Sequence, residues 1–296
     1  MSLKHLSGLD HVVLTVDDLD QAAEGWRKLG FTLSPRGTHS THIGSGNYTI
    51  MLGPDYIELL GILTATPANQ PTRDFLLRHG EGMERAAFTA TDAAAGVEEI
   101  RRLGFAGTGP IDFGRPVALP SGGEAQARFR VFQWPVDEKP AGLRIFACQH
   151  LTPEAVWIPE LQRHANTARR IDRVELLSAD PQSAADKMAR MIDRKPHRDG
   201  EDAWRVPSGS DRAAFVFLDR PALAQRHPGM PLDNLPDEGA ATLALVVDDL
   251  EAAARAAGST AIVREGSVAV PPGAANGIIL AFEAESESRA ALSQRS

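Results

Sequence analysis

An internal repeat restricts the fold of this chain more than any other feature of its sequence. Residues 9–15 have the apolar character of a strand, and Asp18 then stands where a helix cap is expected, before a Leu-Gly-Phe exit at residues 29–31. A shift of 74 positions (85 minus 11) brings a second strand at 83–89, a second cap at Asp92 and a second Leu-Gly-Phe at 103–105 into the same order. The two stretches therefore predict one strand-helix unit twice.

Third and fourth copies of this unit follow. The third begins at residues 171–174 and continues into a helix that starts at Asp180 and Pro181, and the fourth covers residues 243–250. After the helices come runs with the period-two apolar pattern of strands, at residues 48–52, 56–62, 127–134, 143–148, 212–218 and 277–284. Each unit is thus predicted to run strand, helix, then two or three strands.

Four such units predict an α+β fold in which βαβββ units pair into two cup-shaped domains. A sheet covered by its helices on one face must bury or use the other face, and 296 residues suit two domains. We place the first pair at 7–150 (units at about 7–63 and 82–150), a connector at 151–167, a second, degenerate pair at 168–285 and a polar tail at 286–296. A ferredoxin-like αβ sandwich is the alternative.

Composition narrows the choice of partners. The formal net charge is −8 and no run of Lys or Arg could neutralise a row of phosphates, so we expect neither nucleic acid nor an anionic membrane. No apolar window approaches the length of a membrane span. A single cysteine, Cys148, and a start without an apolar leader predict a cytoplasmic protein. A small-molecule substrate is the expected partner, and a homodimer stays open.

Three segments carry a resemblance to a known superfamily. They read Leu-Asp-His-Val-Val at 9–13, Asp-Tyr-Ile-Glu-Leu-Leu at 55–60 and Gly-Ser-Gly-Asn-Tyr at 44–48. With the repeated units, they resemble the vicinal oxygen chelate superfamily, which includes glyoxalase I, extradiol dioxygenases, fosfomycin-resistance proteins and bleomycin-binding proteins. The third segment is similar to a divergent glyoxalase-like subgroup. The resemblance covers nearly the whole chain and implies glyoxalase-like domains.

The resemblance implies a metal site at His11 and Glu58, because the superfamily holds its metal with side chains of the first and fourth strands. The surroundings of Glu58 support this role, since a carboxylate among apolar strand residues needs a cation or several donors. A salt bridge to a neighbouring Arg is the alternative. Alternation places His11 on one sheet face with Leu9 and Val13. A satisfied core histidine is the alternative there.

The second unit departs from the superfamily pattern. Arg85 stands where another nitrogen ligand is expected, and a guanidinium cannot bind a metal; Phe146 or Ala147 stands where an acid is expected. His150 is the candidate third metal ligand and a second catalytic residue beside Glu58. Its alternative is a structural role at the start of the connector. The metal would be Zn, Ni, Mn or Fe.

Further residues are expected around the substrate. His42 lies in a Gly-rich loop that we expect over the mouth of the cup, with a solvated turn histidine as the alternative. Tyr56 and Phe146 lie on the strands that carry the expected site, and Arg85 could bind an anionic substrate. Cys148 is expected to be a small buried hydrophobe rather than a nucleophile.

Three functions remain open from the sequence. In the first, a metal bound by the first pair stabilises an enolate of a small oxygen-rich metabolite in an isomerase or lyase reaction, or supports ring cleavage of the extradiol type if the metal is iron. In the second, a metal-free cup binds a small carboxylate through Arg85, as a binding protein or a cofactorless enzyme. In the third, the protein is purely structural.

Overall fold

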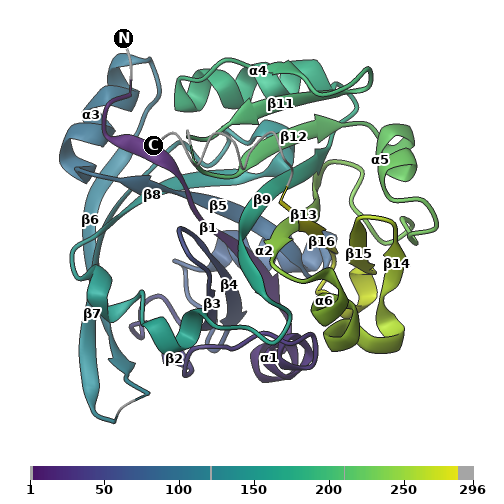
Figure 1. Cartoon of the computed structure of the whole chain (residues 1–296). Helices are drawn as coiled ribbons and strands as arrows, with labels where there is room; N and C mark the ends of the chain where they lie inside the picture. Colours follow the sequence, from purple (N-terminus) through teal and green to yellow (C-terminus); the bar gives the residue numbers. More distant parts are fainter. Residues whose placement is uncertain (1–2, 121, 210, 286–296) are drawn as a thin grey trace.

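The computed structural model describes residues 3–120, 122–209 and 211–285, and its strands form two eight-stranded sheets (Figure 1). In spatial order, the first sheet contains β2 (Gly37–Thr38), β3 (Ser45–Met51), β4 (Tyr56–Ile62), β1 (Leu6–Val16), β5 (Gly82–Ala90), β8 (Arg144–His150), β7 (Glu124–Gln133) and β6 (Thr108–Ala118). The second contains β10 (His197–Arg198), β11 (Ala203–Pro207), β12 (Ala214–Leu218), β9 (Ala168–Leu177), β13 (Gly239–Val247), β16 (Ile279–Ala284), β15 (Ser267–Val270) and β14 (Ile262–Arg264). The polar tail expected at 286–296 lies outside the described residues.

Each sheet consists of two βαβββ units, so the predicted α+β fold of four paired units is confirmed. The helices inside the units are α1 (Leu19–Lys28), α3 (Ala93–Arg102), α4 (Pro181–Ile192) and α6 (Leu250–Ala257). Two further helices, α2 (Gln70–His79) and α5 (Arg220–Arg226), lie between the units of each pair and were not predicted. The start of α2 has no side-chain cap, whereas the Asp219 carboxylate caps α5 by accepting a hydrogen bond from the backbone N–H of Ala222.

The helix caps that revealed the repeat are formed as expected. The Asp18 carboxylate accepts hydrogen bonds from the backbone N–H of Asp20 and Gln21 at the start of α1. The Asp92 carboxylate caps the start of α3 in the same way. At the exit of α1, Gly30 has a φ of +85°, a conformation that glycine adopts without steric cost.

In each sheet the first strands of the two units pair antiparallel, and each first strand pairs parallel with the last strand of its own unit. The β1–β5 pairing has a register shift between Leu9 and His11, which makes Asp10 an extra residue in β1. Leu9 therefore belongs to the main core, whereas His11 and Val13 face the cup. Our prediction that Leu9 shares a face with His11 is wrong because this bulge interrupts the alternation.

The helix-covered faces of both sheets share one apolar core. Phe31 and Phe88 from the first half contact Phe282 and Phe215 from the second, with ring centroids 6.0 Å and 5.7 Å apart. The two halves are thus packed through side chains of the kind that fills a single domain. The two cups lie on the opposite faces of the sheets, so this shared core does not restrict which side chains line them.

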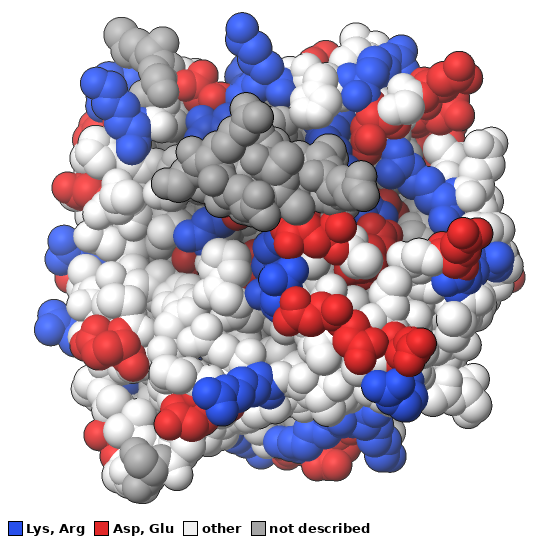
Figure 2. All heavy atoms as spheres, in the orientation of Figure 1, with Lys and Arg blue, Asp and Glu red and all other residues white. Residues whose placement is uncertain are grey.

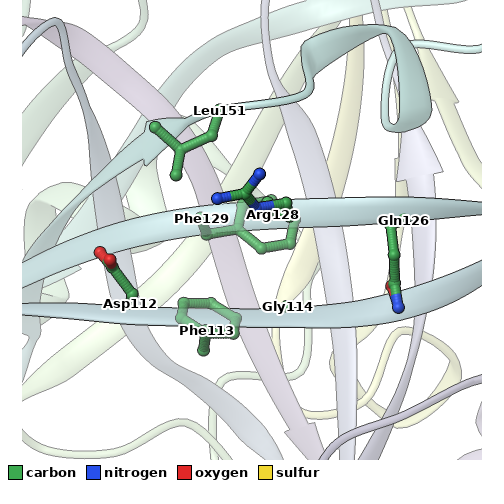
Figure 3. A pocket seen from close by; sticks show the side chains of 7 residues that line it. All are labelled: Asp112, Phe113, Gly114, Gln126, Arg128, Phe129 and Leu151. Atoms are coloured by element: carbon green, nitrogen blue, oxygen red, sulfur yellow. The ribbon is translucent and has the colours of Figure 1, made fainter.

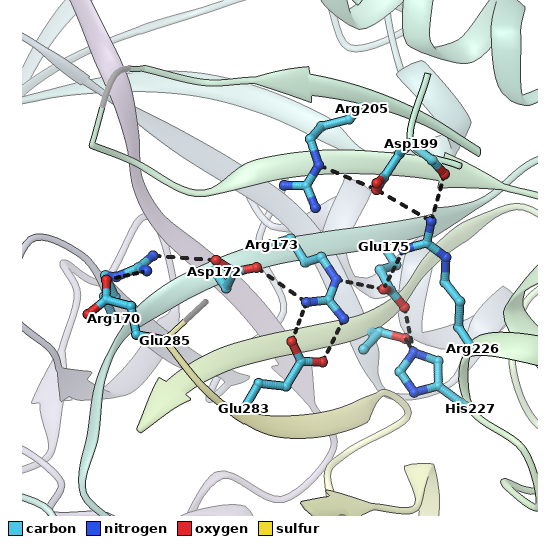
Figure 4. A network of polar contacts seen from close by, with 11 residues as sticks. Arg170, Asp172, Arg173, Glu175, Asp199, Arg205, Arg226, His227, Glu283 and Glu285 are labelled. Atoms are coloured by element: carbon cyan, nitrogen blue, oxygen red, sulfur yellow. Dashed lines mark hydrogen bonds and ion pairs between the residues drawn. The ribbon is translucent and has the colours of Figure 1, made fainter. Parts of the chain in front are cut away.

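The cup of the second sheet is filled by the protein's own side chains (Figure 4). Arg173 donates to Glu175 and to Glu283 at 2.7 Å, and His227 Nε2 lies 2.6 Å from Glu175. Burial raises the pKa of the Glu175 carboxyl, but the charges of Arg173 and His227 outweigh it and hold that pKa well below its usual value. Positive and negative charges therefore compensate each other inside this cup.

The molecular surface carries both signs of charge. On the face shown in Figure 2, basic and acidic side chains alternate and do not gather into a basic patch. Among the described residues, no helix combines the length and the apolar character that a membrane crossing requires.

A buried carboxyl group joins the two halves next to the first cup. Asp55 has no exposed surface, and its Oδ1 accepts a hydrogen bond from the backbone N–H of Ile171 at 3.0 Å. Its Oδ2 has no hydrogen-bond partner within residues 3–120, 122–209 and 211–285. Burial raises the pKa of Asp55 to about 7, against the opposing effects of the Ile171 hydrogen bond and of Arg212 and Arg170. The folded protein therefore holds this proton more tightly than the unfolded chain does.

We expect Asp55→Asn to change how stability depends on pH. Because the folded pKa is raised, the contribution of Asp55 is present below about pH 4 and declines as pH rises toward about 7. The melting temperature of Asp55→Asn minus that of wild type should rise across this range, corresponding to a few kcal/mol in order of magnitude. Asp186→Asn, on the exposed side of α4, is the control and should show no such trend. A flat difference for Asp55→Asn would contradict the assignment.

Candidate functional site

The cup of the first sheet, called the first cup below, encloses a cavity of about 490 Å³. Its floor consists of alternate residues of the central strands, namely His11 and Val13 of β1, Tyr56, Glu58 and Leu60 of β4, Arg85 of β5, and Arg144, Phe146 and Cys148 of β8. The β6–β7 hairpin, the loop at residues 39–43 and Val156 of the connector complete the wall. The period-two alternation of strands explains why residues so distant in sequence meet here.

His11 and Glu58 meet inside this cavity, although they come from different strands. β1 and β4 are parallel, with His11 opposite Tyr56 and Val13 opposite Glu58. The Nε2 atom of His11 lies 3.8 Å from Oε2 of Glu58, and both side chains are largely buried. His11 also stacks on Tyr56, with ring centroids 4.3 Å apart. The structure thus brings together in one cavity the two residues that the sequence analysis paired.

Glu58 lies in a positive environment. Burial raises the pKa of its carboxyl, but His11, His39, the Asn47 amide and Arg85 together outweigh burial, and the net pKa is below the usual value. Asn47 Nδ2 donates to Glu58 Oε1 at 2.7 Å, and His39 Nε2 lies 4.0 Å from the same oxygen. Glu58 is thus a carboxylate at neutral pH.

Asp10, which the sequence analysis did not single out, connects two histidines below the cavity floor. Its carboxylate accepts hydrogen bonds from His11 Nδ1 at 2.7 Å, from His150 Nε2 at 3.0 Å and from Thr89 Oγ1 at 2.8 Å. Burial raises the pKa of Asp10, but these hydrogen bonds and the two histidines outweigh it, so the pKa lies well below its usual value. The hydrogen bond between Asp10 and Nδ1 fixes the orientation of the His11 ring and directs Nε2 toward Glu58.

The residues predicted to contact substrate all line the cavity. Tyr56, Arg85 and Phe146 belong to its floor, and His42 lies at its exposed edge, where its Nδ1 is 3.0 Å from Ser40 Oγ. Cys148 is buried, and burial raises the pKa of its thiol well above the usual value. These placements agree with the roles proposed from the sequence without testing them.

His150 lies at the end of the predicted row on β8 but is not among the residues that line the cavity. Its Nε2 binds Asp10, and its ring packs against Trp157 with centroids 4.7 Å apart. Its Nδ1 is buried and has no hydrogen-bond partner in the described part of the chain. Trp157 also packs against Tyr56, at 5.9 Å. The connector thus closes one side of the first cup instead of only joining the two halves.

Two of the cavity's arginines share one carboxylate. Glu84 is buried and accepts from Arg85 Nη2 at 3.0 Å and from Arg144 Nη1 at 2.6 Å, and two threonine hydroxyls complete its shell. The Nε of Arg85 is buried and has no acceptor among the described residues. A buried donor without a partner is unusual, and Arg85 lines the cavity.

Two other functional candidates were missed by the sequence analysis. His39 and Arg115 line the cavity from the loop before β3 and from β6. Burial lowers the pKa of His39, with Glu58 opposing and Arg115 and Arg85 reinforcing the shift. Neither residue stands in a repeated motif; only the inward parity of Arg115 with Phe113 on a strand could have indicated it.

Comparison with known proteins identifies the family. A family model described as a glyoxalase-like domain matches residues 9–192. The chain belongs to this glyoxalase-like family. It is accordingly a member of the vicinal oxygen chelate superfamily, and the resemblance inferred from the three sequence segments is confirmed. A search of curated protein sequences finds no significant match.

Solved structures support the fold of this glyoxalase-like protein along its whole length. A hypothetical protein from Staphylococcus aureus is 12% identical with a TM-score of 0.67, covering 94% of this chain and 99% of that chain. A mutant of 4-hydroxymandelate synthase from Streptomyces coelicolor is 14% identical with a TM-score of 0.56, over 99% and 100% of the two chains. A fusion of a xylose isomerase-like TIM barrel with 4-hydroxyphenylpyruvate dioxygenase is 13% identical with a TM-score of 0.58, over 100% and 52%. At these identities the likeness concerns the fold.

The superfamily resemblance predicts a metal site in the cup of this glyoxalase-like protein, with His11, Glu58 and His150 as ligands. His11 and Glu58 face each other, but His150, the expected third ligand, binds Asp10 below the floor. Within the described part of the chain, no group of three or more His, Cys, Asp or Glu side chains is arranged to hold a metal ion. A catalytic site normally has three protein ligands, so these residues do not by themselves fit the predicted metal centre.

We expect Asp10→Ala to destabilise the protein strongly. The change removes the acceptor of two largely buried imidazoles and of the half-buried Thr89 hydroxyl, and breaking such a network typically costs about 3–5 kcal/mol. Asp17→Ala, at an exposed position of the same segment, is the control and should stay within about 0.5 kcal/mol of wild type. Urea unfolding measures both, and equal midpoints for the two variants would show that Asp10 does not hold the site together.

Proposed function

We propose that the first cup is an active site that transfers a proton on a small oxygen-rich metabolite, in an isomerase or lyase reaction. The observation that carries this proposal is the pair of His11 Nε2 and Glu58 Oε2, 3.8 Å apart on the wall of a cavity of about 490 Å³. An acid–base pair in a cavity of this size suits chemistry on a small molecule.

Glu58 is the proposed base. It is ionised, its Oε1 is held by the Asn47 amide, and its Oε2 is left toward His11 and the cavity. It would take a proton from a carbon next to a carbonyl group, which breaks the C–H bond and leaves the electron pair as an enolate. The positive groups that lower its pKa make it a weak base until an anionic substrate offsets their charge. Return of the proton to another face or carbon atom completes an isomerisation.

Arg85 is the proposed donor to the oxygen that gains negative charge. Its Nε is buried and finds no acceptor among the residues described, while its Nη2 is held in place by Glu84 and Thr72. A donor that is already oriented before the reaction stabilises a developing oxyanion with little reorganisation. This role needs no metal and corresponds to the cofactorless alternative considered from the sequence.

Hydrogen–deuterium exchange provides the test. We expect wild-type protein in D2O to exchange the hydrogen next to the carbonyl group in at least one of a panel of small 2-oxo and 2-hydroxy acids, followed by NMR. Glu58→Gln should reduce the exchange rate by roughly 100-fold or more, because it removes the base and keeps the shape.

The control is Glu154→Gln, at an exposed position of the connector, which should exchange as wild type does. Exchange that survives in Glu58→Gln would exclude Glu58 as the base. Circular dichroism of both variants checks that the fold is intact.

Metal-assisted chemistry is the second candidate, and one observation favours it. His11 has its Nδ1 bound to a buried carboxylate and its Nε2 directed toward Glu58, the arrangement in which an imidazole commonly binds a metal. His11 and Glu58 would be two ligands of a divalent ion such as Zn, Ni, Mn or Fe. Such an ion would supply Lewis-acid stabilisation of an oxyanion.

Thermal unfolding with added metal distinguishes this candidate. Chelator first removes any metal from the protein. A binding ion that is then added at a concentration of about 100 times its Kd should stabilise wild type by about 2.7 kcal/mol. His11→Ala and Glu58→Gln should lose this effect if both are ligands. His150→Ala should also lose it only if His150 leaves Asp10 to bind the ion, so this variant tests the third ligand predicted from the sequence.

A further inference from the structure

We propose that Arg115 and Asn47 form a recognition subsite for a hydroxycarboxylate in the first cup, where Arg115 binds the carboxylate and Asn47 accepts the hydroxyl hydrogen. This inference rests on the proposed function only in taking the first cup as the active site. It names the class of molecule that the cup selects.

Arg115 reaches the cup at the place where the sheet nearly closes on itself. β2 and β6 are the two edge strands of the first sheet, and they contact each other. Gly37 of β2 lets them approach, because a Cβ atom there would meet the Asn47 side chain and lie 3.0 Å from Nη1 of Arg115. The guanidinium of Arg115 and the amide of Asn47 therefore lie side by side on the cavity wall.

Arg115 is the uncompensated charge of this cavity. Among the described residues, no hydrogen bond or ion pair engages its guanidinium. The other two lining arginines share Glu84, and Asp112 at the rim binds Arg130 on the outer face of the hairpin. A half-buried guanidinium without an acceptor favours a carboxylate, which matches its planar donors.

Asn47 supplies the second half of the recognition. Its side chain is 3% exposed; Nδ2 donates to Glu58, whereas Oδ1 is buried and receives no hydrogen bond from any residue that the structure describes. An unpaired buried acceptor is costly, and a ligand hydroxyl would satisfy it. Because the same amide holds Glu58, a hydroxyl bound there lies beside the proposed base.

The rest of the ligand meets apolar side chains. Phe113 and Phe129 of the hairpin stack with ring centroids 5.0 Å apart, and Val131, Trp134, Ile145 and Phe146 continue this wall. Such a wall suits an aryl or branched alkyl group. A ligand with an apolar group, one carboxylate and one hydroxyl therefore has a suitable contact for each part of the cavity lining.

Isothermal titration tests the subsite with 3-phenyllactate, lactate and 2-hydroxyisocaproate. We expect 3-phenyllactate to bind wild type, and its neutral methyl ester and 3-phenylpropionate, which lacks the hydroxyl, to bind roughly 10- to 100-fold more weakly. Arg115→Ala should lose a similar factor for 3-phenyllactate, and Arg115→Lys should lose less. Asn47→Ala should lose the preference for 3-phenyllactate over 3-phenylpropionate.

Arg128→Ala is the matched control, because Arg128 lies on the same hairpin beside an outer hollow with Gln126 and Leu151 (Figure 3). It should bind 3-phenyllactate as wild type does. No saturable binding of any of the three hydroxy acids to wild type, or unchanged binding in a folded Arg115→Ala, overturns the subsite. Glu58→Gln separates the two proposals. If this variant still binds 3-phenyllactate but no longer catalyses deuterium exchange, both proposals are supported. If it still catalyses exchange, only the role of Glu58 as the base is refuted.

Discussion

The bulge at Asp10 is the local constraint on which the first cup depends. Without this extra residue, alternation along β1 would continue from Leu9 to His11, and one of the two would lie on the wrong face. The bulge lets Leu9 enter the shared core while His11 faces the cavity. It also places a buried carboxylate between two imidazoles, and that carboxylate orients the His11 ring. The bulge therefore determines both the direction of the backbone and the orientation of the His11 side chain.

The two cups show how one fold can carry opposite electrostatic arrangements. In the second cup, Arg173 lies between Glu175 and Glu283, and α5 with the segment that follows it covers the apolar surface. In the first cup, no described residue pairs with Arg115 or accepts a hydrogen bond from the Arg85 Nε. Since buried charges need partners, the charges of the second cup are satisfied within the protein, and we propose that a ligand completes those of the first cup. This contrast is the physical basis for assigning function to the first cup.

The glyoxalase-like fold explains why both cups exist but not what they contain. Four units with the same order of elements produce two sheets of the same topology. The side chains at equivalent strand positions nevertheless differ, from His11 and Arg85 in the first sheet to Arg173 and Thr242 in the second. A shared fold therefore supports membership of the superfamily, whereas chemistry must be argued from the residues of each site.

The unit order and the caps at Asp18 and Asp92 could be predicted from the linear chain, because they depend on hydrogen bonds and alternation between near neighbours. The meeting of His11 with Glu58 followed from the superfamily resemblance. Asp10, Asn47 and Arg115 could not be recognised in this way. Their roles depend on a bulge and on the contact of β2 with β6. Both arise from pairing between strands that are far apart in sequence, and local sequence patterns do not predict that pairing.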